Sequence, residues 1–359
     1  MRAGVGEKPT WRSVIAWLSS AAAFVIIPIP AAFVEAAYST RIYTILQPAI
    51  TSLSNTVSFA LFDVLIAGVV AVLVSMGVRD MRAGKARGAR RALKRALICG
   101  SALYIAFVVF WGLNYRRRPI TDRVAFDAAA VTPDGASRLA SIARDRLNSL
   151  HTAAHAAQST GAIDPALAHA FATVVSDLSH GGRVTVGRPK RSALLDWYFQ
   201  RAGVSGMTDP FFLETMIAGD LLAFERPFVV AHEWSHLAGL NDEGEANLGG
   251  WLTCVRSSPA HQYSGWLFMY DEVLRGLPPE QRAAVAGRLD EGPRADLRAV
   301  HERILRHVNV HIATAGWRAY DTYLKANRVE AGAASYDDVV RLALGIRIAR
   351  AAGDAESTR

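Results

Sequence analysis

The chain has 359 residues, 51% of them hydrophobic, and its formal net charge at pH 7 is +8. A chain of this length can bury a core and still have apolar sequence left over, and that surplus lies in the first third. Its two cysteines, Cys99 and Cys254, lie far apart, which excludes a disulfide framework and a cysteine zinc site. Eight positive charges lie between two apolar runs, at Arg79, Arg82, Lys85, Arg87, Arg90, Arg91, Lys94 and Arg95. This clustering indicates a membrane-topology signal, and we expect no nucleic-acid partner.

Three apolar runs in the first third each approach or exceed the roughly 20 residues that a helix needs to cross a bilayer. They cover residues 13–37, 56–78 and 96–113. The first run is long and no small-residue cleavage site follows it, so we expect a retained helix and not a signal peptide. Asp63 is the one charged residue of the second run. It could be a functional intramembrane acid, but its place near the outer third of the span favours a carboxylate that reaches the interface.

The distribution of lysine and arginine predicts an orientation for these spans. The segment between the first two spans carries only Arg41, whereas the segment between the second and third holds the basic cluster. Because such loops stay in the cytoplasm, we expect this loop and the tail at residues 1–12 to be cytoplasmic. The chain after the third span is then outside. Three arginines at residues 116–118 oppose this orientation, but the loop holds more charges.

The polar remainder, residues 119–351, is predicted to be a mainly helical domain outside the cytoplasm. Apolar residues at helical spacing predict helices at residues 135–155, 165–178, 294–326 and 336–351. Glycines, a proline and an aromatic pair at residues 203–217 predict short strands and turns instead. Helical periodicity resumes at Ala223 and carries the motif described next. The tail at residues 352–359 is expected to be disordered.

Residues 229–237 contain the pattern His-Glu-x-x-His, with His232, Glu233 and His236 at its fixed positions. Two histidines four residues apart lie on the same face of a helix, so both imidazoles can reach one zinc ion. The glutamate beside the first histidine projects toward a zinc-bound water and can act as its general base. A helix with two surface histidines is the simpler interpretation, but apolar residues flank the motif and acidic residues follow it.

A catalytic zinc site takes three protein ligands and keeps one open position. The third ligand is expected from the acidic cluster Asp242-Glu243-Gly244-Glu245. We predict Glu245, because it begins a new apolar-periodic segment and can point back at the metal from a second helix. Asp242 and Glu243 are expected to cap the positive end of that helix.

Tyr263 is a further candidate catalytic residue, because a tyrosine hydroxyl can donate a hydrogen bond to the oxyanion of a tetrahedral intermediate. It could equally be a packing aromatic whose hydroxyl is satisfied elsewhere. His301, His307 and His311 follow along the predicted long helix. Without a neighbouring carboxylate we interpret them as helix-surface residues and not as a second metal site.

These features resemble bacterial membrane proteins known as domain-of-unknown-function family 3810. The most specific shared signature is the His-Glu-x-x-His motif with Gly239 and the step Glu245-Ala246-Asn247. Short motifs across residues 25–345 carry the rest, at Pro28-Ile29-Pro30, Val34-Glu35, Tyr38-Ser39, Ile42-Tyr43, Ser54-Asn55, Asp63, Trp111-Gly112-Leu113-Asn114-Tyr115, Tyr263-Ser264-Gly265, Tyr323-Leu324-Lys325, Asn327 and Ser335-Tyr336. Residues 208–214 are only a loose counterpart of the family's segment before the zinc helix, which leaves the role of Glu214 open.

The resemblance implies three transmembrane helices in a bacterial cytoplasmic membrane, followed by a mostly helical α+β, zincin-like metallopeptidase domain. It also implies Glu245 as the third zinc ligand. We therefore expect a mainly α membrane protein, anchored in the lipid bilayer, that uses Zn²⁺ to hydrolyse envelope proteins or peptides. A membrane-anchored binding or sensor module without turnover, and a purely structural helical ectodomain, are the alternatives. The glutamate base favours the enzyme, since a silent module has no need of it.

Overall fold

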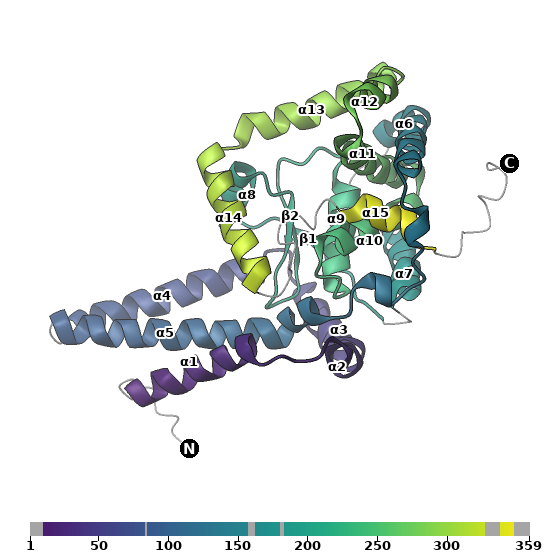
Figure 1. The fold of residues 1–359 in the computed structure, drawn as a ribbon. Coiled ribbons are helices and arrows are strands. Elements are labelled where there is room, and N and C mark those ends of the chain that lie inside the picture. Colours follow the sequence, from purple (N-terminus) through teal and green to yellow (C-terminus); the bar gives the residue numbers. More distant parts are fainter. Residues whose placement is uncertain (1–9, 83–84, 157–161, 180–182, 327–337, 348–359) are drawn as a thin grey trace.

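The computed structural model describes residues 10–82, 85–156, 162–179, 183–326 and 338–347. The chain is mostly helical, with a bundle of apolar helices that projects from a larger globular domain (Figure 1). The tail that is expected to be disordered lies outside the described residues.

The projecting bundle consists of α1 (Trp11–Ile26), α4 (Leu61–Arg82) and α5 (Lys85–Phe110), with α5 packed against both of the others. α4 and the Ala86–Phe110 part of α5 are long and apolar enough to cross a membrane. Within the described residues the number of such spans rises to three if the bent pair that begins with α1 is counted as one span. The chain therefore has the two or three apolar helices of a membrane protein.

The first apolar run is not one straight helix, as residues 13–37 were predicted to be. α1 ends before Pro28, and the chain resumes after Pro30 as α2 (Ala31–Phe33), a π-helix η1 (Val34–Ile42) and α3 (Tyr43–Ser54). The axis turns by 102° at this break. The cause is local, because proline lacks a backbone donor and pushes the residue before it out of the helical region. Ile27 is accordingly extended, with ψ at 120°.

Past α5, the chain passes through the 3₁₀ turns η2 (Gly112–Arg116), η3 (Ile120–Asp122) and η4 (Ala128–Ala130) into the globular domain. The helices of this domain are α6 (Pro133–Ala156), α7 (Pro165–Ser179), α8 (Asp196–Ala202), α9 (Arg226–Leu237), α10 (Glu243–Val255), α11 (Pro259–Gly276), α12 (Pro279–Ala286), α13 (Glu291–His307), α14 (Val310–Ala326) and α15 (Val339–Gly345). The helices predicted at residues 135–155 and 165–178 correspond to α6 and α7.

The strands form one small sheet in the described part of the chain, in the order β1-β3-β2. β1 (Pro189–Lys190) is parallel to β3 (Thr215–Ile217), and β2 (Gly206–Thr208) is antiparallel to β3, with Met207 opposite Met216. Two of these strands lie in the region predicted to hold strands and turns. In Figure 1, α8 and α14 lie on one side of the sheet and α9, α10 and α15 on the other.

The long helix predicted at residues 294–326 is instead two helices, α13 and α14. Val308 leaves the helical region with ψ at 130°, and the side chain of Asn309 then accepts hydrogen bonds from the backbone N–H groups of His311 and Ile312. Asparagine favours this capping position because its side-chain oxygen satisfies the free donors of a helix start. The final helix predicted at residues 336–351 is, in the described residues, the shorter α15.

Residues beside the apolar bundle hold the C-terminal end of α9 in place. The Tyr43 hydroxyl donates to the carbonyl of Leu237 at 3.1 Å, and the Trp111 indole N–H donates to the carbonyl of His236 at 3.2 Å. The Arg117 guanidinium donates to the carbonyls of Ala238 and Gly239. Carbonyls at a helix end have no partner within the helix, so these donors satisfy the groups that α9 leaves free. The segments that join the apolar bundle to the globular domain thus support the helix that carries the His-Glu-x-x-His motif.

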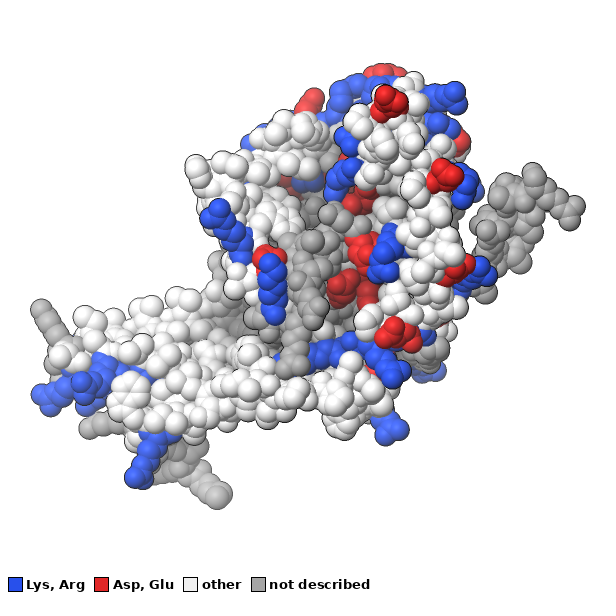
Figure 2. Space-filling view, in the orientation of Figure 1, with Lys and Arg blue, Asp and Glu red and all other residues white. Residues whose placement is uncertain are grey.

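Surface charge divides the molecule in the same way. In Figure 2 the sides of the projecting helices are almost uncharged, and basic side chains gather at their far tip. This tip is where α4 ends at Arg82 and α5 begins at Lys85. Lys94 lies 4.8 Å from the ring centroid of Trp11, the first residue of α1, so the start of α1 lies near the same end.

Candidate metal centre

α9 places the two histidines of the motif on one face. His232 and His236 are one turn apart, their ring centroids are 4.7 Å apart, and their side chains are 12% and 8% exposed. The opposite face of α9 is buried, and Trp234 on that face is fully enclosed, with its indole N–H donating to the carbonyl of Gly187. This burial fixes the rotation of α9 and therefore the direction of both imidazoles.

The third side chain at this point is Glu243, the first residue of α10. Its Oε2 lies 3.4 Å from Nε2 of His232 and 3.5 Å from Nε2 of His236. The three ligand atoms all lie within 4.8 Å of one another. His232, His236 and Glu243 are therefore the motif-containing group that could hold a metal ion.

The prediction that Glu245 points at the histidines is wrong. Its carboxylate accepts the backbone N–H of Ile120 at 2.7 Å and forms a buried ion pair with Arg123. Asp242 caps α10 as predicted, by accepting the N–H of Glu245, but Glu243 is not a capping residue. The third ligand differs from the prediction because Glu243 and Glu245 lie on opposite faces of α10. Two positions along a helix correspond to a rotation of about 200°. With α10 beginning at Glu243, that residue faces α9 and Glu245 faces away.

Two glycines allow α10 to approach α9 closely. A Cβ added to Gly249 would lie 2.5 Å from Oγ of Ser235, and one added to Gly250 would lie 3.0 Å from the backbone nitrogen of His232. Larger residues at these positions would push the helices apart, because interiors are close-packed. The small residues thus bring a carboxylate of one helix within reach of the histidines of the other.

The donor set fits a zinc ion. Ligand atoms of a tetrahedral site with bonds of ~2.0–2.1 Å are about 3.4 Å apart, which is close to the two separations measured here. Oε2 of Glu243 is buried and has no hydrogen-bond partner in the described part of the protein, a costly arrangement unless a cation satisfies it. Nδ1 of His236 lies 2.9 Å from the carbonyl of Leu240, which favours a proton on Nδ1 and leaves Nε2 free for the metal.

The charges of His232, His236 and Glu243 also favour a cation at this point. Burial opposes the charged form of His236, yet the Glu243 carboxylate raises the pKa of His236 to about 9. Burial likewise opposes ionisation of Glu243, but the two histidines hold its pKa well below the usual range. A carboxylate enclosed among imidazoles is stabilised by a cation, either protons on the rings or a metal between them.

Glu233 lies beside this group, as the motif predicts. Its Oε2 accepts a hydrogen bond of 2.8 Å from the hydroxyl of Thr208 in β2, and burial raises the pKa of Glu233. Gly206 in the same strand leaves room for it, since a Cβ there would lie 2.6 Å from Oε1 of Glu233. The start and end of β2 therefore both touch the candidate base.

The sequence did not indicate Tyr320, whose hydroxyl donates a hydrogen bond to Oε1 of Glu243 from α14. The two residues are 77 positions apart, and no motif surrounds Tyr320, so only the tertiary structure reveals the contact. A partner that holds one carboxylate oxygen fixes the direction of the other, which is how residues behind metal ligands orient them.

The predicted catalytic residue Tyr263 has a different neighbour. It is fully buried, and its hydroxyl donates a hydrogen bond to Asp296 on α13. Its ring contacts those of His151 and Phe224. Its hydroxyl and its ring thus contact residues other than His232, His236 and Glu243, so the structure favours the packing interpretation over the oxyanion role.

The sequence matches the family described as a protein of unknown function (DUF3810) over residues 38–344. This match covers most of the chain, and the protein belongs to that family. Comparison with curated proteins and with solved structures gives no match.

Proposed function

We propose that this DUF3810 member is a membrane-anchored, zinc-dependent peptidase with a zincin-like site. In this proposal His232, His236 and Glu243 hold the metal and Glu233 is the general base. The observation that carries it is the buried Oε2 of Glu243, which faces both Nε2 atoms at 3.4 and 3.5 Å and lacks a hydrogen-bond partner among the described residues. Three ligands leave the fourth position open, as catalysis requires.

A zinc ion at this place would supply Lewis acidity, which polarises a peptide carbonyl and acidifies water. Glu233 would accept the proton of the attacking water on its carboxylate and deliver it to the leaving amine. Thr208 holds one oxygen of Glu233 in place, which leaves Oε1 to handle the proton.

The strand β2 supports a peptide as the substrate. It lies at the edge of the sheet, paired with β3 on one side and with no other described strand on the second. Its last residue, Thr208, contacts the candidate base. An extended peptide that added to this edge would run past Glu233, with backbone hydrogen bonds that fix its register.

The apolar helices support a bilayer as the anchor, and the basic tip supports its orientation. If the tip is cytoplasmic, the globular domain at the other end of α4 and α5 lies outside the cytoplasm. The three arginines that oppose this orientation include two with partners in the protein. Arg116 donates to the carbonyl of Phe24, and Arg117 pairs with Glu35. Substrates of the enzyme are then envelope proteins or peptides.

The test is to separate metal binding from hydrolysis in full-length protein purified in detergent. Glu233→Gln should keep zinc and lose hydrolysis by a factor of ~10²–10⁴, because glutamine keeps the shape but cannot accept a proton. His232→Ala should lose the zinc ion of this centre, because one of its three protein ligands is gone. Zinc content is measured beside cleavage of a peptide mixture. Glu302→Gln, on the exposed surface of α13, is the matched control and should change neither.

Hydrolysis that survives in Glu233→Gln would exclude this residue as the base. Zinc without hydrolysis in the wild-type protein, over a broad peptide mixture, would favour a silent metal-containing binding or sensor module instead.

A further inference from the structure

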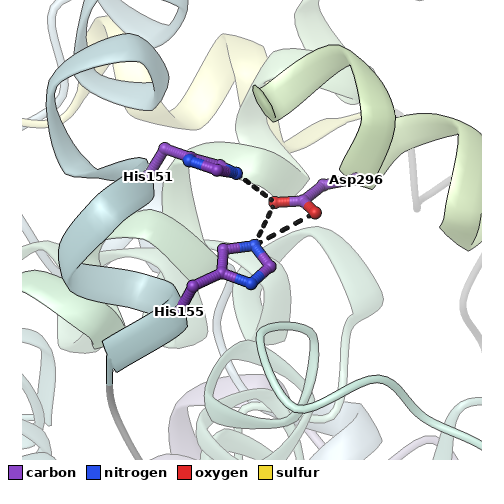
Figure 3. Close-up of side chains that lie close together, drawn as sticks. All are labelled: His151, His155 and Asp296. Atoms are coloured by element: carbon purple, nitrogen blue, oxygen red, sulfur yellow. Dashed lines mark hydrogen bonds and ion pairs between the residues drawn. The ribbon is translucent and has the colours of Figure 1, made fainter. Parts of the chain in front are cut away.

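A second group of metal-ligand side chains lies in the globular domain, on elements that do not form the first centre. His151 and His155 are one turn apart on α6, and Asp296 faces them from α13 (Figure 3). Nε2 of His155 lies 2.9 and 3.1 Å from the two carboxylate oxygens of Asp296. Nε2 of His151 lies 3.5 Å from Oδ2 of Asp296. One ligand atom from each residue lies within 4.8 Å of the others.

The arrangement repeats the chemistry of the first centre. Two imidazoles at i and i+4 share one helix face, and a carboxylate from a second helix faces both. The 3.5 Å separation of His151 from Asp296 is longer than an ordinary hydrogen bond and close to the ~3.4 Å between ligands of a tetrahedral ion. The distances for His155 are those of a hydrogen bond, so its ring would have to move by a few tenths of an ångström on metal binding.

The surrounding residues hold this group in place. The Tyr263 hydroxyl donates to Oδ2 of Asp296, the oxygen that both imidazoles face, and so fixes the position of the carboxylate. Gly292 lies one turn before Asp296 on α13, and a Cβ there would lie 2.6 Å from the imidazole of His151. Glycine at this point therefore leaves the space that the ring occupies. The rings of His155 and Tyr263 both pack against Phe224.

The group is anchored on one side and open on the other. The Asp296 side chain is 9% exposed, whereas those of His151 and His155 are 30% and 45% exposed. An ion between them would therefore have protein ligands on its inner side and solvent on its outer side. Such a site can exchange its metal and can bind a further ligand.

We propose that His151, His155 and Asp296 bind a second divalent transition-metal ion, of the kind that takes imidazole nitrogen and carboxylate oxygen. Zn²⁺ and Fe²⁺ fit this donor set, whereas Ca²⁺ and Mg²⁺ prefer oxygen ligands alone. Two imidazoles and a tyrosine hydroxyl converge on the buried carboxylate of Asp296. A bound cation would give the carboxylate and both imidazoles a common partner. The proposal does not depend on the proposed peptidase activity.

The experiment counts zinc in the full chain, purified in detergent, stripped with a chelator and dialysed against Zn²⁺. The wild-type protein should hold about two ions and His232→Ala/His236→Ala about one, because each centre supplies its own ligands. Adding Asp296→Asn to that variant should remove the remaining ion. Asparagine is close to isosteric and can still accept from Tyr263, so a loss of zinc without a loss of folding is expected. Mg²⁺ in place of Zn²⁺ should not bind.

The matched control is His301→Ala, an exposed histidine five positions beyond Asp296 on α13, which should keep both ions. If the variant without His232 and His236 does not fold, Asp296→Asn alone is compared with His301→Ala. Asp296→Asn should then lose one of the two ions, and His301→Ala should lose none. Unchanged zinc in Asp296→Asn would overturn the second site and leave the first intact. Loss of all zinc in His232→Ala/His236→Ala would also overturn the second site while supporting the first.

Discussion

Glu243 and Glu245 lie two positions apart on α10 and have different roles. The carboxylate of Glu243 faces the two histidines, while that of Glu245 forms an ion pair with Arg123 and accepts the N–H of Ile120. Both side chains are largely buried, so both need partners. The first has a proposed metal and the second has a guanidinium. Substituting each in turn should therefore give opposite results.

In a protein that lacks the second site through His151→Ala/His155→Ala, Glu243→Gln should weaken zinc binding by more than the ~10–100-fold typical of an outer-shell loss. Glu245→Gln should keep zinc but lower the free energy of unfolding by about 1.5–3 kcal/mol, because Arg123 loses a charged partner. A zinc titration and a denaturant unfolding curve measure the two effects. The assignment fails if Glu245→Gln is the variant that loses zinc.

At this scale, local spacing predicts the histidine pair and the base, because they depend only on the period of a helix. The third ligand depends on the residue at which α10 begins, and a shift of two positions turns the side chain to the other face. The contact between Tyr320 and Glu243 spans 77 positions and leaves no local pattern. The sequence therefore predicts the residues on α9. The contributions of Glu243 and Tyr320 depend on how other helices pack against α9.

At the scale of elements, the junction between the bundle and the globular domain accounts for several residues of the family resemblance. Asp63, in the first turn of α4, accepts hydrogen bonds from the Ser192 hydroxyl and the Ala193 N–H. Glu214 accepts the N–H groups of Leu61 and Phe62 at the start of α4. These carboxylates stabilise the positive end of the helix and tie it to the segments around the sheet. Asp63 thus joins the start of α4 to the globular domain.

Glu214 also pairs with Lys190, and both side chains are almost fully buried. Glu214→Ala should lower the free energy of unfolding by about 3–5 kcal/mol, because it leaves a buried ammonium without its partner. The double variant Lys190→Met/Glu214→Gln should be less destabilised than Glu214→Ala, since it buries no charge and keeps an acceptor for α4. Thermal unfolding of the three proteins in the same detergent compares them. A double variant less stable than Glu214→Ala would contradict this account of the pair.

Two helix breaks that the apolar periodicity missed occur at residues whose own chemistry favours a break. Pro28 and Pro30 break the first apolar run, and Asn309 begins α14 by capping its backbone donors. The apolar periodicity on both sides of each break continues, and periodicity alone therefore predicted uninterrupted helices. Proline and asparagine chemistry, weighed against that periodicity, is the signal that could have located both breaks.

At the scale of the whole molecule, three features are consistent with one orientation. The basic residues gather at the tip of α4 and α5, the start of α1 lies near that tip, and the globular domain lies at the opposite end. Lysine and arginine beside membrane spans stay on the cytoplasmic side. We therefore expect the N-terminus and the tip inside the cell and the candidate metal centre outside.

Reporter fusions test this orientation. A reporter that is active only outside the cytoplasm should be active when fused after Arg359 and inactive when fused after Arg82, at the end of α4. A reporter that is active only in the cytoplasm should give the reverse pattern. Cytoplasmic activity after Arg359 would contradict both the orientation and the assignment of envelope substrates.

In the proposed centre, α9 and α10 together hold the metal ion. Anomalous diffraction from crystals of the zinc-loaded full chain, measured on both sides of the zinc absorption edge, locates the ion without reference to activity. A peak is expected within about 2.0–2.2 Å of Nε2 of His232, Nε2 of His236 and a carboxylate oxygen of Glu243. A map with no peak between these three residues, or with the peak beside Glu245, would contradict it.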